Sequence, residues 1–376
     1  MKILILNSIL YTADNYVIPS RDSIKDCMIY NLALGFKELG HQVTLIAASE
    51  YKPVKEETYD IDVIFLKSQF KKILLPSVLP FQPKLWSYLL KERKKIDLII
   101  SSEVFAFPSL FAVIFAPEKT IIWHELAVHT KKMKSIPSYF WYNVIAKLFY
   151  KNTLIIVRSE NAKKFISKYL PHVSTDAVEH GINLQKFRFS KDKKKQFIVV
   201  SQLILRKNIS NIITKFYHFL QKEVYSDFKL IIVGIGELET ELKEQVSQLG
   251  IDKNIDFVGF KSHSVLNQLL AESMAMLIDT KQDNNMVSIP ESIVSGTPVV
   301  TNLIPTNSST ISEYNLGIAK TEWDESDLKD IIDNNDFYVQ NCIAKRGDLS
   351  SESSALKMIT AYLKYKNNKQ KHQIIT

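Results

Sequence analysis

Two carboxylates, Asp283 and Glu291, flank the predicted start of a helix in the segment 279–301, DTKQDNNMVSIPESIVSGTPVVT. Apolar residues recur at helical spacing after the loop, and Gly296 followed by Pro298 is a helix stop signal. A helix N-terminus carries unpaired backbone N–H groups and partial positive charge, which suit a phosphate or a diphosphate. Glu291 can accept two hydrogen bonds from a vicinal diol such as a ribose. Phosphate and diol together describe a nucleotide.

The spacing Asp283-x7-Glu291, followed by SGTPVV, resembles the Glu-x7-Glu signature of the retaining glycosyltransferases of family 4. Three further stretches agree with family motifs in their order: EHGINLQKF at 179–187, SQLILRKN at 201–208, and the segment 233–260 that begins VGIG and ends FVGF. Together these four motifs identify the family specifically, although each motif alone is weak evidence. The resemblance implies an α/β fold of the GT-B class, in which two Rossmann-like parallel-sheet domains face a central cleft.

The activity that the resemblance implies is hexosyl transfer with retention of configuration. The donor is expected to be a nucleotide-sugar, by preference a UDP-sugar. The acceptor is expected to be a glycan or a lipid-linked molecule in cell-surface polysaccharide synthesis. No cofactor is expected, because the architecture works without a metal.

The resemblance also implies a donor site in the second half of the chain. Lys207 matches the family's phosphate-binding lysine, and Arg206 beside it is a second cation. Asp283 stands where the family more often has glutamate, and it is expected to address the donor sugar or the charge that develops at its anomeric carbon. Glu291 is expected to bind the ribose. The other residues expected at the donor are Gly234, Phe260, Asn284, Asn285, Met286 and Val287.

The first half is expected to carry the acceptor side. His124 and Glu125 follow a predicted strand at 120–123, and open α/β sheets bind ligands at the carboxyl ends of their strands. Family members often have HE or HD here, so His124 is predicted as a second catalytic residue and Glu125 as an acceptor-side residue. The family's paired glycines in the first loop are replaced by residues 19–23. Arg21 in this loop either takes over an anion contact or belongs to a purely structural loop.

Two rival functions stay open. A sugar-nucleotide epimerase shares the GT-B architecture, but it should not need the pattern at 279–301. A non-catalytic partner subunit is favoured by two departures from the family: Gln202 replaces an arginine, and Asn284, Asn285 and Met286 replace a Gly-Phe-Gly.

Two apparent metal motifs are rejected. The pair Asp60 and Asp62 has the Asp-x-Asp spacing of metal-dependent transferases, but it leads into a predicted strand at 63–66 and the rest of the chain favours a metal-free site. His124 and His129 are five residues apart. On a helix, at about 100° per residue, they would point about 140° from each other and could not share zinc.

Length and composition predict a two-domain protein with folded cores, because the chain has 376 residues of which 46% are hydrophobic. The net charge of +8 comes from many lysines, and no nucleic-acid motif is present. The two cysteines, Cys27 and Cys342, favour a reducing cytoplasm over a disulfide framework. The apolar region 98–116 contains Glu103 and Pro108 and is therefore not expected to span a membrane.

Alternating strand and helix patterns predict a parallel sheet in each half. Residues 1–187 are expected to form the acceptor-side domain, 188–350 the nucleotide-sugar domain, and 351–376 a helix that returns to the first domain and ends in a frayed tail. The segment 188–196 is the best linker candidate.

The segment 138–152, SYFWYNVIAKLFYKN, is aromatic and has lysines within it and before it, at Lys131, Lys132 and Lys134. It is interpreted either as a helix on the cytoplasmic face of the inner membrane, beside a lipid-linked acceptor, or as a core-facing helix of the first domain. The protein is accordingly expected in the cytoplasm, with peripheral membrane contact as an open alternative.

Overall fold

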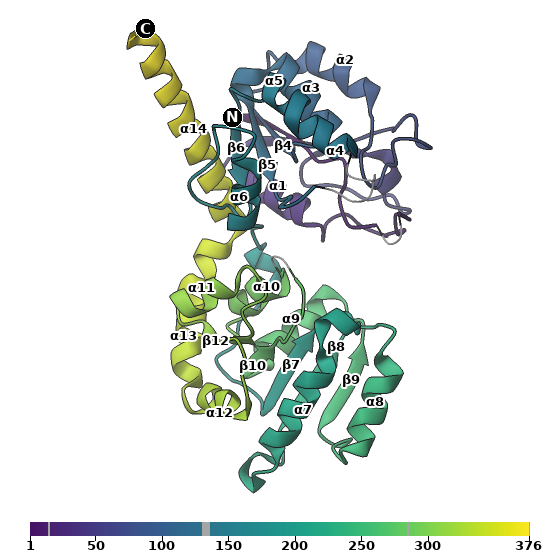
Figure 1. Cartoon of the computed structure of the whole chain (residues 1–376), viewed down its shortest axis with the longest axis vertical. Coiled ribbons are helices and arrows are strands. Elements are labelled where there is room, and N and C mark those ends of the chain that lie inside the picture. Colours follow the sequence, from purple (N-terminus) through teal and green to yellow (C-terminus); the bar gives the residue numbers. More distant parts are fainter. Residues whose placement is uncertain (14–15, 130–135, 284–285, 376) are drawn as a thin grey trace. The chain divides into compact units, whose positions relative to one another are not determined.

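A computed structural model describes residues 1–13, 16–129, 136–283 and 286–375, with side chains described to residue 370. The chain forms two compact units (Figure 1): Met1–Asn183 with Ser350–Thr376, and Leu184–Leu349. The sequence analysis placed these divisions after residues 187 and 350. Each unit is described by itself below.

Unit 1 is built on a six-stranded parallel sheet in the order β3-β2-β1-β4-β5-β6. This is the strand order of a dinucleotide-binding Rossmann domain. The strands are β1 (Lys2–Leu6), β2 (Gln42–Ala48), β3 (Asp62–Leu66), β4 (Leu98–Ser102), β5 (Thr120–His124) and β6 (Leu154–Val157). They are near-continuous apolar runs, as expected for strands that are buried on both faces.

Helices cover both faces of this sheet. Ile3 and Ile5 of β1 point to a core formed with α1 (Met28–Glu38) and α14 (Ser351–Ile375), whereas Leu4 and Leu6 point to α2 (Pro83–Glu92) and α3 (Phe107–Phe115). The remaining helices are α4 (Ile136–Phe140), a π-helical turn (Trp141–Ala146), α5 (Lys147–Phe149) and α6 (Glu160–Ile166). The α6 helix begins after Ser159, whose hydroxyl caps it by accepting the N–H of Ala162 at 3.2 Å.

The α14 helix packs on α1 at very short range. A Cβ added to Gly35 of α1 would lie 2.3 Å from the Ser351 carbonyl oxygen, so only glycine permits this approach. Ala355, Met358 and Tyr362 of α14 extend the same core. The helix continues to Ile375, where the sequence analysis expected a frayed end.

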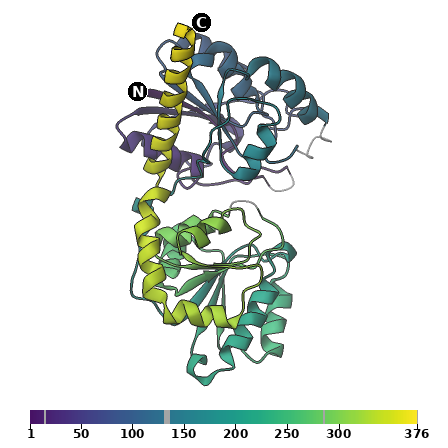
Figure 2. The ribbon, with the colours of Figure 1, turned by 60° about the vertical axis from the view of Figure 1, so that its left-hand side comes forward.

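Unit 2 repeats the strand order of unit 1, as β12-β11-β10-β7-β8-β9. Its strands are β7 (Gln196–Val200), β8 (Lys229–Val233), β9 (Ile255–Gly259), β10 (Ala275–Leu277), β11 (Val299–Thr301) and β12 (Gly317–Ala319). The parallel sheet that the alternating pattern predicted for this half of the chain is confirmed. Figure 2 shows helices on both sides of each sheet.

The helices of unit 2 are α7 (Ile209–Leu220), α8 (Glu239–Gln248), α9 (His263–Glu272), α10 (Ser288–Val294), α11 (Ser308–Glu313), α12 (Glu325–Asp333) and α13 (Asn335–Lys345). Neighbouring strands β7 and β10 start the two halves of the sheet, so the chain leaves them in opposite directions. Such a switch point leaves a crevice at the carboxyl ends of the strands, where open α/β sheets bind ligands. The described residues that border it are 201–208, 279–283 and 286–287. Within the described part of the chain, no helix is long and apolar enough to cross a membrane.

Candidate functional site at the switch point of unit 2

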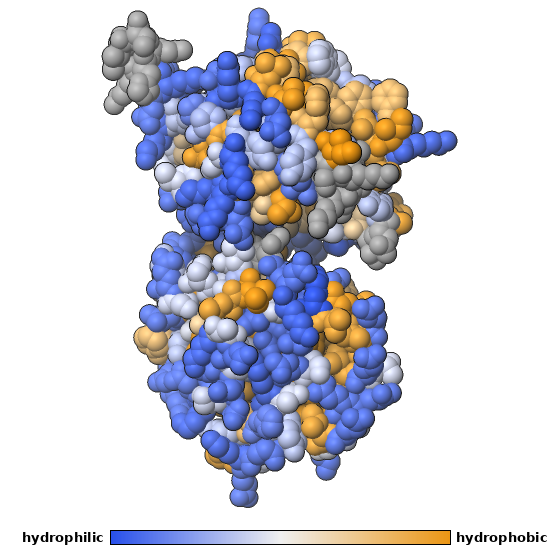
Figure 3. All heavy atoms as spheres, viewed as in Figure 1, coloured by the Kyte–Doolittle hydropathy of each residue, from blue (hydrophilic) through white to orange (hydrophobic). Residues whose placement is uncertain are grey.

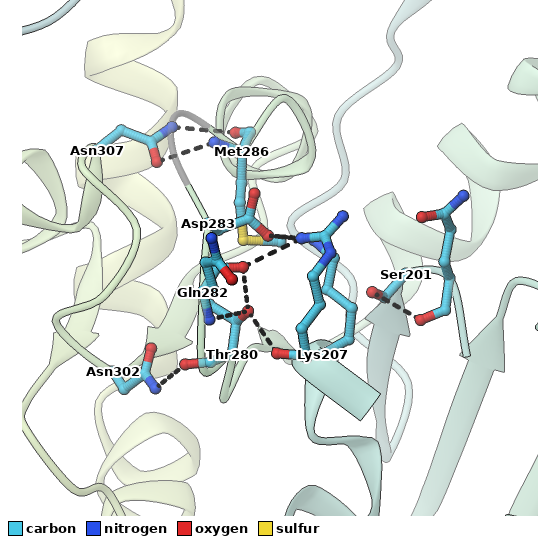
Figure 4. Close-up of polar contacts among 10 residues, drawn as sticks. Ser201, Lys207, Thr280, Gln282, Asp283, Met286, Asn302 and Asn307 are labelled. Carbon is cyan, nitrogen blue, oxygen red and sulfur yellow. Dashed lines mark hydrogen bonds and ion pairs between the residues drawn. The ribbon is translucent and has the colours of Figure 1, made fainter. Parts of the chain in front are cut away.

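The loops after β7 and β10 are joined by hydrogen bonds (Figure 4). The carbonyl oxygen of Arg206 accepts the Thr280 hydroxyl at 2.9 Å and the Lys281 N–H at 2.7 Å. The Arg206 guanidinium donates to the Gln282 carbonyl at 3.1 Å. These contacts fix the backbone of one loop against the other, and so they set where the side chains of both loops meet.

Asp283 is where the two loops place opposite charges together. Its carboxylate pairs with the Lys207 ammonium and lies 3.2 Å from the Arg206 guanidinium. The Lys207 and Asp283 side chains are only 11% and 16% exposed, so water screens this pair weakly. The structure thus brings together the three charged residues that the sequence assigned to donor phosphate and donor sugar. Two cations beside one carboxylate leave this group with a net positive charge, which favours an anionic ligand.

Asp279, two residues after the end of β10, holds this loop pair through a cluster of polar contacts. It is buried, and its carboxylate accepts the side-chain amides of Asn211 and Asn302 and the Lys215 ammonium, the last two at 3.2 Å. Lys215 also lies 4.3 Å from the centre of the Trp323 ring. Sequence reasoning missed Asp279 as a functional candidate, because its partners come from α7 and from beyond β11 and only the fold collects them.

Removing the charge of Asp279 should destabilise unit 2. In Asp279→Asn the Lys215 ammonium keeps its buried place but loses its counter-charge, so we expect the free energy of unfolding to fall by ~1–2 kcal/mol. Urea unfolding followed by circular dichroism measures this. Asp336→Asn, at an exposed position of α13, is the matched control and should leave the midpoint unchanged. Equal midpoints for both variants would show that Asp279 does not hold the loops.

Close packing explains why both Gly234 and Gly236, in the loop after β8, are glycines. A Cβ at Gly234 would lie 1.7 Å from the Ser201 carbonyl oxygen, and one at Gly236 would lie 2.3 Å from that of Leu203. The loop after β8 therefore rests on the backbone of the loop after β7, and Gly234 acts by permitting this approach. Phe260, beyond β9, is exposed and has its ring free for a contact with a flat ligand group.

The α10 helix begins at Ser288 and has 7 residues. Met286 before it is buried, and its backbone N–H and carbonyl bond to the side-chain amide of Asn307 at 3.3 and 3.0 Å. Val287 is the residue that precedes the helix. Asn307 is a second residue that sequence reasoning missed. Asn284 and Asn285, both predicted at the donor, lie outside the described residues.

Glu291 lies in the first turn of α10. It is half-buried, and its carboxylate makes no hydrogen bond or ion pair with a side chain in the part of the chain that the structure describes. Burial raises the pKa of Glu291 from 4.5 to about 7. A carboxylate with unused acceptor capacity suits a ligand that donates hydrogen bonds, such as a diol.

His124, predicted as catalytic, is fully buried at the end of β5 in unit 1. Its Nδ1 lies 2.9 Å from a carboxylate oxygen of Glu103, and its ring stacks on Phe165. Glu103 and aromatic rings therefore cover His124, and its catalytic role stays a prediction. Glu103 and Glu125, at the same edge of the sheet, are partly exposed.

Glu103 is a third residue that sequence reasoning missed. It follows β4 with φ of 68°, a conformation that non-glycine residues seldom adopt. Its carboxylate accepts the Glu125 N–H at 3.0 Å. Burial raises the pKa of Glu103. The interactions with His124 and Arg158 and the hydrogen bond from the Glu125 N–H lower it, and together they leave this pKa below its ordinary value.

Glu125 and Arg21, the two residues predicted on the acceptor side, have different surroundings in unit 1. Glu125 accepts Arg158 at 2.6 Å, and Arg158 lies 3.5 Å from the centre of the Trp123 ring, so Glu125 belongs to a built polar cluster. Arg21 is exposed, and its guanidinium lies 4.5 Å from the centre of the Tyr11 ring.

The rejected metal motifs serve other purposes. Asp60 accepts the Tyr30 hydroxyl at 2.9 Å, and Asp62 begins β3. His129 bonds to the hydroxyls of Ser138 and Tyr169 at 3.0 and 2.9 Å. Within the described ranges, no group of three or more His, Cys, Asp and Glu side chains is arranged to hold a metal ion.

Two family models match the chain. The model described as Glycosyltransferase Family 4 matches residues 28–186, and the model described as Glycosyl transferases group 1 matches residues 182–334. The boundary between the two matches falls close to the boundary between the two units. The second model covers both loops of the candidate site.

Curated relatives and solved structures agree with these models. An alpha-monoglucosyldiacylglycerol synthase of Streptococcus pneumoniae is 25% identical over 43% of this chain, and the match spans only 40% of that relative's length. A sucrose-phosphate synthase from Thermosynechococcus elongatus has a TM-score of 0.61 at 14% identity, with 96% of this chain and 98% of that chain covered. HepE of Anabaena, determined with UDP and glucose, gives the same values. These structures confirm the predicted fold class, with two Rossmann-like units of the GT-B type.

Proposed function

Because this chain belongs to the group 1 glycosyltransferases of family 4, we propose that it transfers a hexose from a nucleotide-sugar, by preference a UDP-sugar, with retention of configuration. The acceptor is a hydroxyl of a glycan or a lipid-linked molecule. The observation that carries the proposal is the meeting of Arg206, Lys207 and Asp283 at the switch point of unit 2.

Different residues of the site are assigned to the diphosphate, the sugar and the ribose of a nucleotide-sugar. In the proposal, the diphosphate binds Lys207 and Arg206, which are the cations of the loop after β7. Asp283 gives up part of its ion pairing to these cations and accepts hydrogen bonds from the sugar. Glu291 accepts the hydroxyls of the ribose. The bond from the anomeric carbon to the diphosphate oxygen breaks, and the electron pair leaves with the diphosphate. The acceptor hydroxyl oxygen forms the new bond on the same face of the sugar, and its proton passes to the departing diphosphate.

Two kinds of support bear on donor and acceptor. HepE, which has the same fold, was determined with UDP and glucose. The name of the Streptococcus pneumoniae relative describes a glucosylated diacylglycerol, which favours a lipid among the possible acceptors. The proposal assigns neutralisation of the leaving diphosphate to the two cations and therefore needs no metal ion.

The test is an incubation of the purified full chain with a panel of UDP- and GDP-sugars and of glycan and lipid acceptors, followed by mass spectrometry. We expect a mass increase of one hexose on an acceptor and an equal amount of released nucleoside diphosphate, insensitive to EDTA. Conversion of the nucleotide-sugar without an acceptor would favour an epimerase. Binding without turnover, restored by a second protein, would favour a non-catalytic subunit, as the departure at Gln202 allows.

Donor binding should depend on pH through Glu291. A diol donates hydrogen bonds to the ionised carboxylate, so binding lowers the pKa of Glu291 from about 7 and releases a proton. Affinity for a UDP-sugar should rise as pH increases towards about 7 and stay constant above it. Titration calorimetry in buffers of different ionisation enthalpy measures the released proton. A UDP-sugar is the right probe, since its diphosphate does not itself titrate near neutral pH.

Glu291→Gln should abolish this pH dependence, and Glu313→Gln, at an exposed position of α11, should retain it. The raised pKa of Glu291 also makes the stability of the folded protein depend on pH. The folded state keeps its proton up to about pH 7 while the unfolded state loses it near pH 4.5, so unliganded stability should fall as pH rises through this window. A pH dependence that persists unchanged in Glu291→Gln would contradict the assignment.

A further inference from the structure

Unit 1 exposes large apolar side chains on the layer formed by α2, α3, α4 and α5. Figure 3 shows hydrophobic side chains gathered over these helices. The six that define this apolar patch are between 45% and 63% exposed: Trp86, Leu90, Tyr139, Phe140, Val144 and Leu148. Contiguous exposure of this kind on a soluble unit marks an interaction surface.

The α3 helix packs against both parts of the patch. The Trp86 ring of α2 lies 4.5 Å from the Phe115 ring of α3, between ring centres. The Phe107 ring of α3 lies 5.4 Å from the Trp141 ring, which follows α4. The α3 helix itself, FPSLFAVIF, has no charged residue.

These exposed residues are not needed by the core beneath them. Leu85 and Leu89 of α2 fill the core with no exposed surface, as does Tyr142 of the π-helical turn. The π-helical turn shifts the register between α4 and α5. The core-facing interpretation of the segment 138–152 therefore holds for one of its faces, and the other face is open.

Lysines border the patch. Lys84, Lys91 and Lys94 lie on or just after α2, and Lys147 and Lys151 lie at α5 and just after it; all five are exposed, and none forms an ion pair with a residue that the structure describes. At about 100° per residue, Trp86 and Leu90 occupy one side of the open face of α2, and the three lysines occupy the other. The only acidic residue of the helices α2 to α5 is Glu92.

We propose that this patch docks unit 1 on the surface of a bilayer that contains anionic lipids. Aromatic and aliphatic side chains would enter the boundary between headgroups and acyl chains, while the lysines meet the anionic headgroups. Charge decides between a bilayer and a second copy of the chain. A two-fold dimer through this face would set the same lysines against each other without compensating acids. The inference does not depend on the proposed function, because it concerns binding and not transfer.

The experiment is flotation of the full chain with vesicles of phosphatidylcholine, with and without phosphatidylglycerol. We expect binding to vesicles that contain phosphatidylglycerol and weakening at high salt, because screening removes the lysine contribution. The apolar variant Tyr139→Ser, Phe140→Ser, Leu148→Ser and the charge variant Lys147→Glu, Lys151→Glu should each lower vesicle affinity at least tenfold. Circular dichroism confirms that both variants remain folded.

The matched control replaces exposed apolar residues of unit 2, Val224→Ser and Phe337→Ser, and should float like the parent chain. Equal binding of the parent and the two patch variants would overturn the proposal. So would a dimer, detected by sedimentation without vesicles, that the same patch substitutions dissociate. Vesicle binding and sugar transfer are measured in separate assays. A negative result in one assay therefore does not affect the conclusion from the other.

Discussion

Asp283→Asn should lower kcat for sugar transfer about 100-fold or more, which corresponds to an electrostatic loss of ~3 kcal/mol. The carboxylate is the group of the site that can accept donor-sugar hydroxyls and stabilise positive charge at the anomeric carbon. Its loss also releases Lys207 and Arg206, which it pairs with in the unliganded protein. Affinity for the nucleoside diphosphate should therefore be unchanged or tighter. Steady-state kinetics and UDP titration on one preparation separate the two effects.

The conservative variant Asp283→Glu should retain most of the activity, since the family more often has glutamate here. Asp336→Asn, exposed on α13, is the charge-matched control and should behave like the parent chain. A near-normal kcat with only a raised donor KM for Asp283→Asn would mean that this carboxylate serves binding or loop structure and not the chemical step.

Lys207→Ala should weaken binding of a nucleoside diphosphate by ~1.5–3 kcal/mol, because a charge-assisted hydrogen bond to phosphate is lost. Lys207 is the better covered of the two cations, at 11% exposure against 41% for Arg206, so its contact is screened less. The variant also leaves Asp283 with one cationic partner instead of two. Titration calorimetry with UDP measures the affinity, and thermal unfolding shows whether the fold is retained.

Lys222→Ala, which alters an exposed lysine after the far end of α7, is the matched control. It changes net charge by the same amount, so any general electrostatic attraction is weakened equally in both variants. Equal UDP affinity in Lys207→Ala and Lys222→Ala would refute the phosphate assignment of Lys207.

Much of the fold follows from sequence patterns, and the reasons are local. The apolar runs of β1 and β8 can only be strands buried on both faces, and their alternation with helices requires parallel sheets. The loop residues Arg206, Lys207 and Asp283 were predicted to share a ligand from motif spacing, and the strand order explains why they meet.

The residues that sequence reasoning missed depend on long-range packing. Asp279 takes partners from α7 and from the chain after β11, and Glu103 is held by residues that follow β5. Burial of His124 arises from Phe165 and Glu103, neither of which is near it in the sequence. The π-helical turn is a backbone shift that side-chain periodicity does not reveal.

Hydrogen–deuterium exchange of the full chain, with and without saturating UDP, tests the central claim most directly. The claim is that the nucleotide of the donor binds where the loops after β7 and β10 meet at the switch point of unit 2. We predict slower exchange in peptides that cover residues 201–208 and 279–294, and unchanged exchange in α12 and α13. Slower exchange elsewhere with none in these two segments, or no effect of UDP at millimolar concentration, would contradict the account.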